Sequence, residues 1–218
     1  MLPGATLFVA VCTQRDFWPG GAAALVDGAT AANVATLVGV GARLRIRTGG
    51  ICCLHDSWPR GSAPDRTSVA STTAPALATH CLVGTAGADF APGGAPALPV
   101  IVVAAGSVAP ALDRVHAYYV ASGCDAGVDA GTLHARVFDH LAAGVRDAVV
   151  FGAGVEYGLA HAVDALLHRR VRTHVPLDAA AAVDDAAAQL VIADWKRRGV
   201  DVATTATLIR LLERTATS

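Results

Sequence analysis

The stretch VVFGAGVEYGLAHAVDAL, residues 149–166, indicates the fold more directly than any other part of the chain. Its first residues are an apolar run, VVF, that is typical of a buried strand. We expect the strand to end at Gly152, and apolar residues then recur at helical spacing from Leu159 onward. Unpaired N–H groups at the start of such a helix can hold an anion or an oxyanion. The stretch therefore predicts a strand, a tight turn and a helix, with a ligand site near Gly154–Gly158.

Strands and helices alternate along the rest of the chain. Residues 6–12 have the composition of a strand, and residues 33–43 have the apolar spacing of a helix. The same reasoning predicts strands at 45–54, 99–104, 148–151, 171–177 and 200–204, and helices at 132–143, 159–169 and 184–198. This alternation favours a three-layer α-β-α fold of the α/β class with a mainly parallel sheet. We expect one domain over residues 1–218, because no segment resembles an interdomain linker.

The composition favours a small, weakly charged ligand. The chain has 17 basic and 18 acidic side chains, a net charge of −1 and no block of basic residues. We therefore expect no nucleic-acid partner, and the uncharged stretch 90–112 is too rich in Pro and Gly to span a membrane. The five cysteines form no CxxC pair, and no cationic region precedes the N-terminal apolar run. These features predict a cytoplasmic protein with reduced thiols.

Four segments resemble one known family. TQRDFWPGG (13–21) is similar to that family's exit from its first strand, and THCLVGTAGADF (79–90) matches its H-C-V-x-G-T-x-G-A-E-F segment almost residue for residue. VVFGAGVEYGLAHAVDALL (149–167) is similar to the family's nucleophile turn, and WKRRGVDVATTATLI (195–209) to its closing helix and strand. The chain thus resembles the isochorismatase-like superfamily of cysteine hydrolases, in particular its nicotinamidase branch. The resemblance implies that family's fold.

The catalytic triad that the resemblance implies is missing. Members similar to nicotinamidase use an Asp as proton acceptor, a Lys that stabilises charge and a Cys nucleophile, because a thiolate needs a base and a cation to form at neutral pH. The corresponding positions here are Cys12, Ala105 and Gly158, and Lys196 is the only lysine. Isochorismatases also replace the Cys by Gly, but they keep the Asp. A thiol at position 12 is a poor general acid for cleaving an enol ether.

The resemblance also implies a substrate pocket. It assigns the N–H groups of Gly154 and Gly158 to an oxyanion hole and Phe17 to the pocket wall, and Tyr157 lies in the same turn. Two metal positions of the family are matched by Asp56 and His80. Trp58 stands where a ligating His is expected, and Pro64 or Asp65 near another ligand. Two ligands make a poor metal site, so we expect no cofactor, with a divalent metal as the alternative.

Other side chains in these motifs have both a catalytic and a structural interpretation. Cys12, Asp16 and Glu156 are the candidate catalytic residues. A Cys at the end of an apolar strand is more often buried and inert, and Asp16 and Glu156 match family positions with largely structural roles. The segment 55–79, rich in Pro, Ser, Thr and Gly, is expected to be a long loop that contributes to ligand specificity.

Three functional hypotheses remain open. The leading one is a non-hydrolytic protein that binds a small molecule or acts as a regulatory or structural subunit. The second is a hydrolase of a small amide, carbamoyl or enol-ether compound with altered catalytic residues. The third is a dinucleotide-binding protein, because GAGVEYG lies between a strand and a helix and the next strand ends at Asp178. The resemblance further implies a homo-oligomer.

Overall fold

The central feature of the computed structural model is a sheet whose strands are mostly parallel. The structure describes residues 1, 3–53, 77–78, 80–82, 84–94, 101–105, 115–120 and 138–216. In this part of the chain the sheet order is β4-β3-β2-β1-β5-β6-β8, with β7 beside β5. Only the β3–β4 pair is antiparallel among these strands. The strands are β1 Thr6–Val11, β2 Arg47–Cys53, β3 Ile101–Ala105, β4 Val115–Val120, β5 Asp147–Ala153, β6 Arg172–Pro176, β7 Ala180–Ala181 and β8 Asp201–Ala203.

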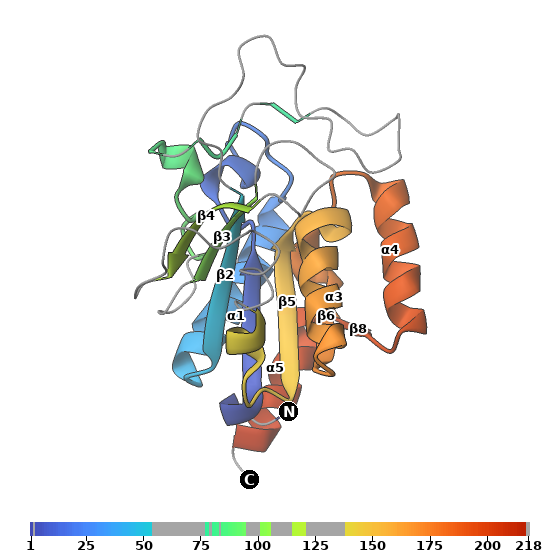
Figure 1. Ribbon diagram of the computed structural model, residues 1–218. Helices are drawn as coiled ribbons and strands as arrows, with labels where there is room; N and C mark the ends of the chain where they lie inside the picture. The colour runs from blue at the N-terminus through green and yellow to red at the C-terminus, as the bar shows by residue number, and fades with distance from the viewer. Residues whose placement is uncertain are drawn as a thin grey trace.

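Helices cover both faces of this sheet (Figure 1). The long ones are α1 Gly28–Arg43, α3 Ala160–His168, α4 Asp185–Arg197 and α5 Thr205–Ala216, and residues 138–142 are also helical. Short helical turns are η1 Pro3–Ala5, η2 Arg15–Phe17, η3 Ala86–Ala88, η4 Val155–Leu159 and η5 Leu177–Ala179. The side chain of Asp27 accepts a hydrogen bond from the N–H of Thr30 at the start of α1, and Asp184 accepts one from Ala187 at the start of α4.

The alternation of side chains along the strands divides the core into two layers. In β1, Leu7 and Val9 face the cluster that contains Leu166 of α3 and Trp195 of α4. The intervening Phe8 faces the other cluster, whose helical residues are Val34 and Leu37 of α1 and Leu208 and Leu212 of α5. Successive side chains of a strand point to opposite faces, so each layer of helices packs on its own set of strand residues. The predicted three-layer α/β fold is confirmed.

Most of the predicted elements are present, with one correction in the stretch that indicated the fold. The strand does not end at Gly152 but continues to Ala153. Gly152 has a φ of 126°, and a Cβ on it would lie 1.9 Å from the carbonyl O of Val11. Glycine is therefore required there because β1 passes so close, and it does not mark the end of the strand.

Other differences concern elements that the sequence reading missed or placed differently. The strands β4 and β7 and the helix α5 were not predicted, and α1 starts at Gly28, earlier than expected. The predicted loop 55–79 lies largely outside the described residues, as does the first half of the predicted helix 132–143. Over the described ranges, no helix combines the length and apolarity needed to cross a bilayer.

Candidate functional site

The candidate site lies where parallel strands of the sheet end. Val11 pairs with Ile51, and Cys53 pairs with Ala105, so β1, β2 and β3 end at the same edge. β5 ends at that edge too, since Val11 also pairs with Gly152. Ligands of open α/β sheets bind outside such carboxyl ends. Two positions implied by the resemblance, Cys12 and Ala105, thus stand on this edge.

The turn η4 brings position 158 against position 12. Gly154, with a φ of 81°, leads from β5 into η4. A Cβ built on Gly158 would lie 2.7 Å from Cγ1 of Val11 and 3.8 Å from Sγ of Cys12. The distance to Val11 is too short for two carbon atoms that are not bonded to each other, and the distance to Cys12 is an ordinary van der Waals contact. The side chains of Val11, the last residue of β1, and of Cys12, which follows it, therefore lie beside Gly158.

Cys12 itself has an uncommon backbone conformation. Its φ is 48°, in the left-handed region that non-glycine residues rarely adopt, and its N–H donates to the carbonyl O of Ile51 at 2.6 Å. Its side chain is half-buried. Non-glycine residues in this region cluster at functional sites, so the chain geometry at Cys12 is consistent with a retained pocket.

The N–H of Gly154 is engaged within the fold. It donates to the carbonyl O of Ala181 in β7 at 2.8 Å, and the carbonyl O of Gly154 accepts from the N–H groups of Tyr157 and Leu159. The Gly154 N–H therefore helps to hold β7 beside the end of β5. The oxyanion role that the resemblance gives to Gly158 stays a prediction. The place of Tyr157 in the substrate pocket stays a prediction as well.

Glu156 links the turn η4 to the start of α4. Its Oε1 accepts hydrogen bonds from the N–H groups of Val183, at 2.9 Å, and Asp184. Its Oε2 is buried and has no hydrogen-bond partner among the described residues. Burial raises the pKa of this carboxyl, and the nearby Asp184 adds to the rise, although backbone N–H groups oppose it. These contacts support the structural interpretation of Glu156.

Asp16 holds three segments of the chain together. Its Oδ2 accepts from the N–H of Cys81 at 2.7 Å, and its Oδ1 accepts from the N–H of Ala22 at 3.3 Å. Gly87 lies so close that a Cβ on it would stand 2.1 Å from Oδ2. The carboxylate is thus used to join the loop after β1 to residues 81–87, as the structural interpretation of Asp16 predicts.

The two aromatic candidates contact each other. The rings of Phe17 and His80 have centroids 5.0 Å apart, and both residues are buried. Nδ1 of His80 lies 2.7 Å from the carbonyl O of Ala78. Phe17 therefore packs against His80, which matches a metal position of the family that the chain resembles. Phe17 belongs to the core layer that contains α1.

The metal positions are only partly described. Asp56, Trp58, Pro64 and Asp65 lie outside the described residues. Within the described ranges no three His, Cys, Asp or Glu side chains are grouped so that they could hold a metal ion. Of the metal positions that the resemblance implies, the described residues thus include His80 alone.

Asp178 has a different role from the one that a dinucleotide site needs. Its Oδ1 accepts from the N–H of Thr205 at 2.8 Å and from Oγ1 of the same residue at 2.9 Å. The carboxylate therefore binds the first turn of α5, a helix that the sequence did not predict. A ribose-binding acid has to offer its oxygens to the cofactor, so this arrangement speaks against the dinucleotide hypothesis.

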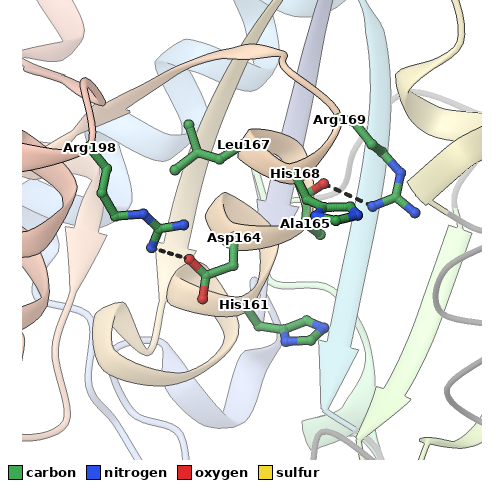
Figure 2. Close-up of a pocket in the computed structure, with 7 residues that line it drawn as sticks. All are labelled: His161, Asp164, Ala165, Leu167, His168, Arg169 and Arg198. Atoms are coloured by element: carbon green, nitrogen blue, oxygen red, sulfur yellow. Dashed lines mark hydrogen bonds and ion pairs between the residues drawn. The ribbon is translucent and has the colours of Figure 1, made fainter.

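A surface hollow occurs elsewhere, beside α3. Figure 2 shows its lining of His161, Asp164, Ala165, Leu167 and His168 on α3, with Arg169 after the helix and Arg198 after α4. Arg198 is paired with Asp164 at 2.5 Å. This hollow was not expected from the sequence, because its cations follow helices far apart in the chain.

Several solved structures are similar to this chain over nearly its whole length. PnC1 from L. infantum, in complex with nicotinate, has 22% identity and a TM-score of 0.62, covering 92% of this chain and 93% of that one. A pyrazinamidase of Pyrococcus horikoshii in complex with zinc has 16% identity and a TM-score of 0.64, covering 92% and 99%. A putative isochorismatase hydrolase from Oleispira antarctica has 16% identity and a TM-score of 0.65, covering 95% and 97%.

The fold is isochorismatase-like. Neither the protein-family models nor the curated proteins gave a match to the sequence. At these identities the likeness establishes the fold, and a fold of this kind carries many activities. The function of the isochorismatase-like chain has to be argued from the residues of its site.

Proposed function

We propose that this chain is a non-hydrolytic protein of isochorismatase-like fold that binds a small planar amide or carboxylate. The lack of space for a side chain at Gly158 carries the proposal. A nucleophilic side chain at position 158 needs a Cβ, and the place of that Cβ lies 2.7 Å from Cγ1 of Val11. A side chain at this position, which carries the nucleophile in the family that the chain resembles, therefore requires Val11 or the turn η4 to shift.

The hydrogen bonds of the nearby acids support the same proposal. A general base has to reach the proton that it removes. Asp16 accepts from the backbone of Cys81 and Ala22, and Glu156 accepts from that of Val183 and Asp184. Both carboxylates thus stabilise loops that frame the site.

The class of ligand is proposed from the related structures. PnC1 binds nicotinate, and its chain aligns with nearly all of this one. The resemblance assigns Phe17 to the wall of a substrate pocket, and a flat aromatic ring packs well on another aromatic side chain. Nicotinate and nicotinamide are therefore the first probes.

The test combines turnover and binding. We expect no ammonia release from nicotinamide, pyrazinamide, N-carbamoyl amino acids or ureido acids, with either the wild type or Cys12→Ser. We expect nicotinate to raise the melting temperature, and Phe17→Ala to abolish that rise. Gly39→Ala, on the exposed side of α1, is the matched control that should leave binding unchanged. Ammonia release by the wild type but not by Cys12→Ser would establish the alternative, a hydrolase that uses the Cys12 thiol.

The chain is also proposed to form a homo-oligomer. Leu190 on α4 is 75% exposed, an unusual state for a large apolar side chain. α4 carries Asp185 in its first turn and Lys196 and Arg197 in its last, so two copies packed antiparallel would pair opposite charges. Light scattering is expected to give a multiple of the 22.0 kDa chain mass that falls to one chain for Leu190→Glu. A single-chain mass for the wild type would reject this part of the proposal.

A further inference from the structure

Arginines gather at the edge of the sheet opposite the candidate site. They stand at or just before the first residues of several parallel strands, and all of their side chains are exposed. These basic residues are Arg45 and Arg47 at β2, Arg146 at β5, Arg170 and Arg172 at β6, and Lys196, Arg197 and Arg198 before β8. We call this set the amino-edge row.

The register of the sheet aligns the row. Leu7 pairs with Arg47, Thr6 pairs with Asp147, and Asp147 pairs with Arg172, so β2, β5 and β6 begin at nearly the same level. The N–H of Arg172 also donates to the carbonyl O of Arg146 at 3.0 Å. The row crosses the strands β2, β1, β5, β6 and β8, which at a spacing of roughly 4.8 Å spans about 19 Å.

Four cations of the row form no ion pair within the part of the chain that the structure describes. Arg172 is paired with Asp147, and Arg197 and Arg198 are paired with Asp194 and Asp164. Among the residues that the structure describes, no ion pair involves Arg45, Arg146, Arg170 or Lys196. Arg47 donates to the carbonyl O atoms of Leu141 and Ala143, which carry no net charge.

Helix ends explain only some of these cations. Basic residues favour the last turn of a helix, which accounts for Lys196 and Arg197. Arg45 and Arg170 follow α1 and α3 with φ values of 53° and 59°, in the left-handed region. Glycine is the favoured residue at such a position, because a Cβ is strained there. Two arginines are therefore kept where the backbone alone would favour glycine, which indicates a use for their side chains.

The hollow beside α3 adjoins this edge. Arg169 and Arg198 lie on its two sides with His168 between them, and Arg198 is also part of the row (Figure 2). A surface that is recessed there, and on which four exposed cations make no ion pair with the described residues, can receive an extended anionic chain. The sequence showed no basic block because these residues are up to 153 positions apart, from 45 to 198, and only the sheet register joins them.

We propose that the amino-edge row binds the phosphate backbone of a nucleic-acid duplex, through charge and without reading bases. Arginine binds phosphate with its planar fork, and a row of cations suits the regular charges of a duplex. The exposed large apolar side chains of the described part are Leu190 and Leu211, on α4 and α5, so no apolar patch accompanies the row that could insert into a lipid surface. The proposed surface lies at the opposite edge of the sheet from the candidate site and does not depend on the proposed function.

The test measures binding of a fluorescently labelled 20-base-pair RNA duplex by anisotropy, with the whole chain. Four phosphate contacts predict about a hundredfold loss of affinity between 50 and 200 mM salt. The double variant Arg45→Gly/Arg170→Gly should reduce that loss to about tenfold, since two contacts are removed. The same substitutions should raise the melting temperature by about 2–4 °C each, because they relieve left-handed strain. The double variant should therefore bind the duplex more weakly than the wild type while being at least as stable.

The matched control is Arg15→Gly. Arg15 is exposed and follows β1 at the opposite edge of the sheet, so its loss should leave duplex affinity unchanged. No binding at 50 mM salt, equal weakening by Arg15→Gly, or an unchanged salt dependence in the double variant would each overturn the proposal. Tighter binding to vesicles that contain phosphatidylserine than to the duplex would overturn it in favour of a lipid surface.

Discussion

The Sγ atom of Cys12 lies 3.8 Å from the place where a Cβ on Gly158 would stand. These two residues come from the end of β1 and from the turn after β5, and they occupy the positions that the resemblance assigns to the acid and the nucleophile of a hydrolase. The fold thus keeps the proximity of the two positions, while the side chains present there are a thiol and a hydrogen atom. Whether this site could support hydrolysis can be tested by placing a nucleophilic side chain at position 158.

The first prediction is that Gly158→Cys does not restore hydrolysis. The new Cβ would lie 2.7 Å from Cγ1 of Val11, so the turn or β1 has to shift. Inserting a side chain into a packed site costs about 1–3 kcal/mol, and the melting temperature of a chain of this size falls by about 2–4 °C per kcal/mol. Thermal unfolding and ammonia release from nicotinamide measure both effects.

The control for this variant is Val11→Ala/Gly158→Cys. Removing Cγ1 of Val11 makes room for the new Cβ, so the double variant should lose less stability than the sum of its single variants. Strict additivity would show that Val11 is not what closes position 158, and the main support for a non-hydrolytic site would be lost.

The second prediction concerns pH and Glu156. Burial raises the pKa of its carboxyl in the folded chain above the usual 4.5. The stability that this group contributes is then full below pH 4.5 and is lost as pH rises through the folded pKa. Glu156→Gln keeps an oxygen for the N–H groups of Val183 and Asp184 but does not ionise. Urea unfolding between pH 4.5 and 8 should therefore show the variant gaining stability relative to the wild type as pH rises.

Glu156→Ala separates the hydrogen bonds from the charge. It removes the acceptor for both N–H groups, which costs about 1–3 kcal/mol for each buried donor left without a partner. We expect it to be less stable than Glu156→Gln at every pH. Equal stability of the two variants would mean that the link between η4 and the start of α4 is energetically unimportant.

The sequence predicted the fold because its core strands have a strong apolar signal. β5 contains the apolar run AVVF at residues 148–151, and the motif around His80 and Cys81 matches a known family closely. The short strands were missed for a physical reason. β7 is only Ala180–Ala181, held by its pairing with the end of β5, and no local composition reveals such a pairing.

The candidate site was harder to predict, because its contacts join distant parts of the chain. The sequence shows a glycine at 158, but not that Val11 fills the space beside it. It shows Asp178 at the end of a strand, but not that α5 begins at Thr205 and uses that carboxylate. A Thr that follows an apolar strand and precedes helical spacing was the one available signal for that helix start.

The third prediction concerns Asp147, which is almost fully buried at the start of β5. Its Oδ1 accepts from Nε of Arg172 at 2.5 Å and lies 3.2 Å from Nε2 of His174. Burial raises the pKa of this carboxyl, but the hydrogen bonds from Arg172 and His174 outweigh that effect and hold it below 3.8. Stability from this group is then present above pH 3.8 and is lost as pH falls through the folded pKa.

Asp147→Asn should accordingly destabilise the chain by about 1.5–3 kcal/mol at pH 7, the range for hydrogen bonds to charged groups. The difference from the wild type should shrink as pH falls from 3.8 through the folded pKa of Asp147, because the wild-type carboxyl then becomes protonated too. Asp201→Asn is the matched control, because Asp201 contacts the other ring nitrogen of His174 but its carboxyl is 53% exposed. Its cost should stay below about 1 kcal/mol. A larger loss for Asp201→Asn than for Asp147→Asn would contradict this ranking.

The last prediction compares two glycine-to-alanine substitutions of opposite sign. At Gly87 a Cβ would stand 2.1 Å from Oδ2 of Asp16, so Gly87→Ala has to displace the carboxylate from the N–H of Cys81. At Gly39, on the exposed side of α1, no atom lies within 4 Å of the new Cβ. We expect Gly87→Ala to destabilise by about 1–3 kcal/mol through the lost hydrogen bond, and Gly39→Ala to stabilise by about 0.5–1 kcal/mol through helix propensity. Urea unfolding of both variants checks the signs, and nicotinate binding should weaken only for Gly87→Ala, because only that substitution disturbs the loop that carries Phe17.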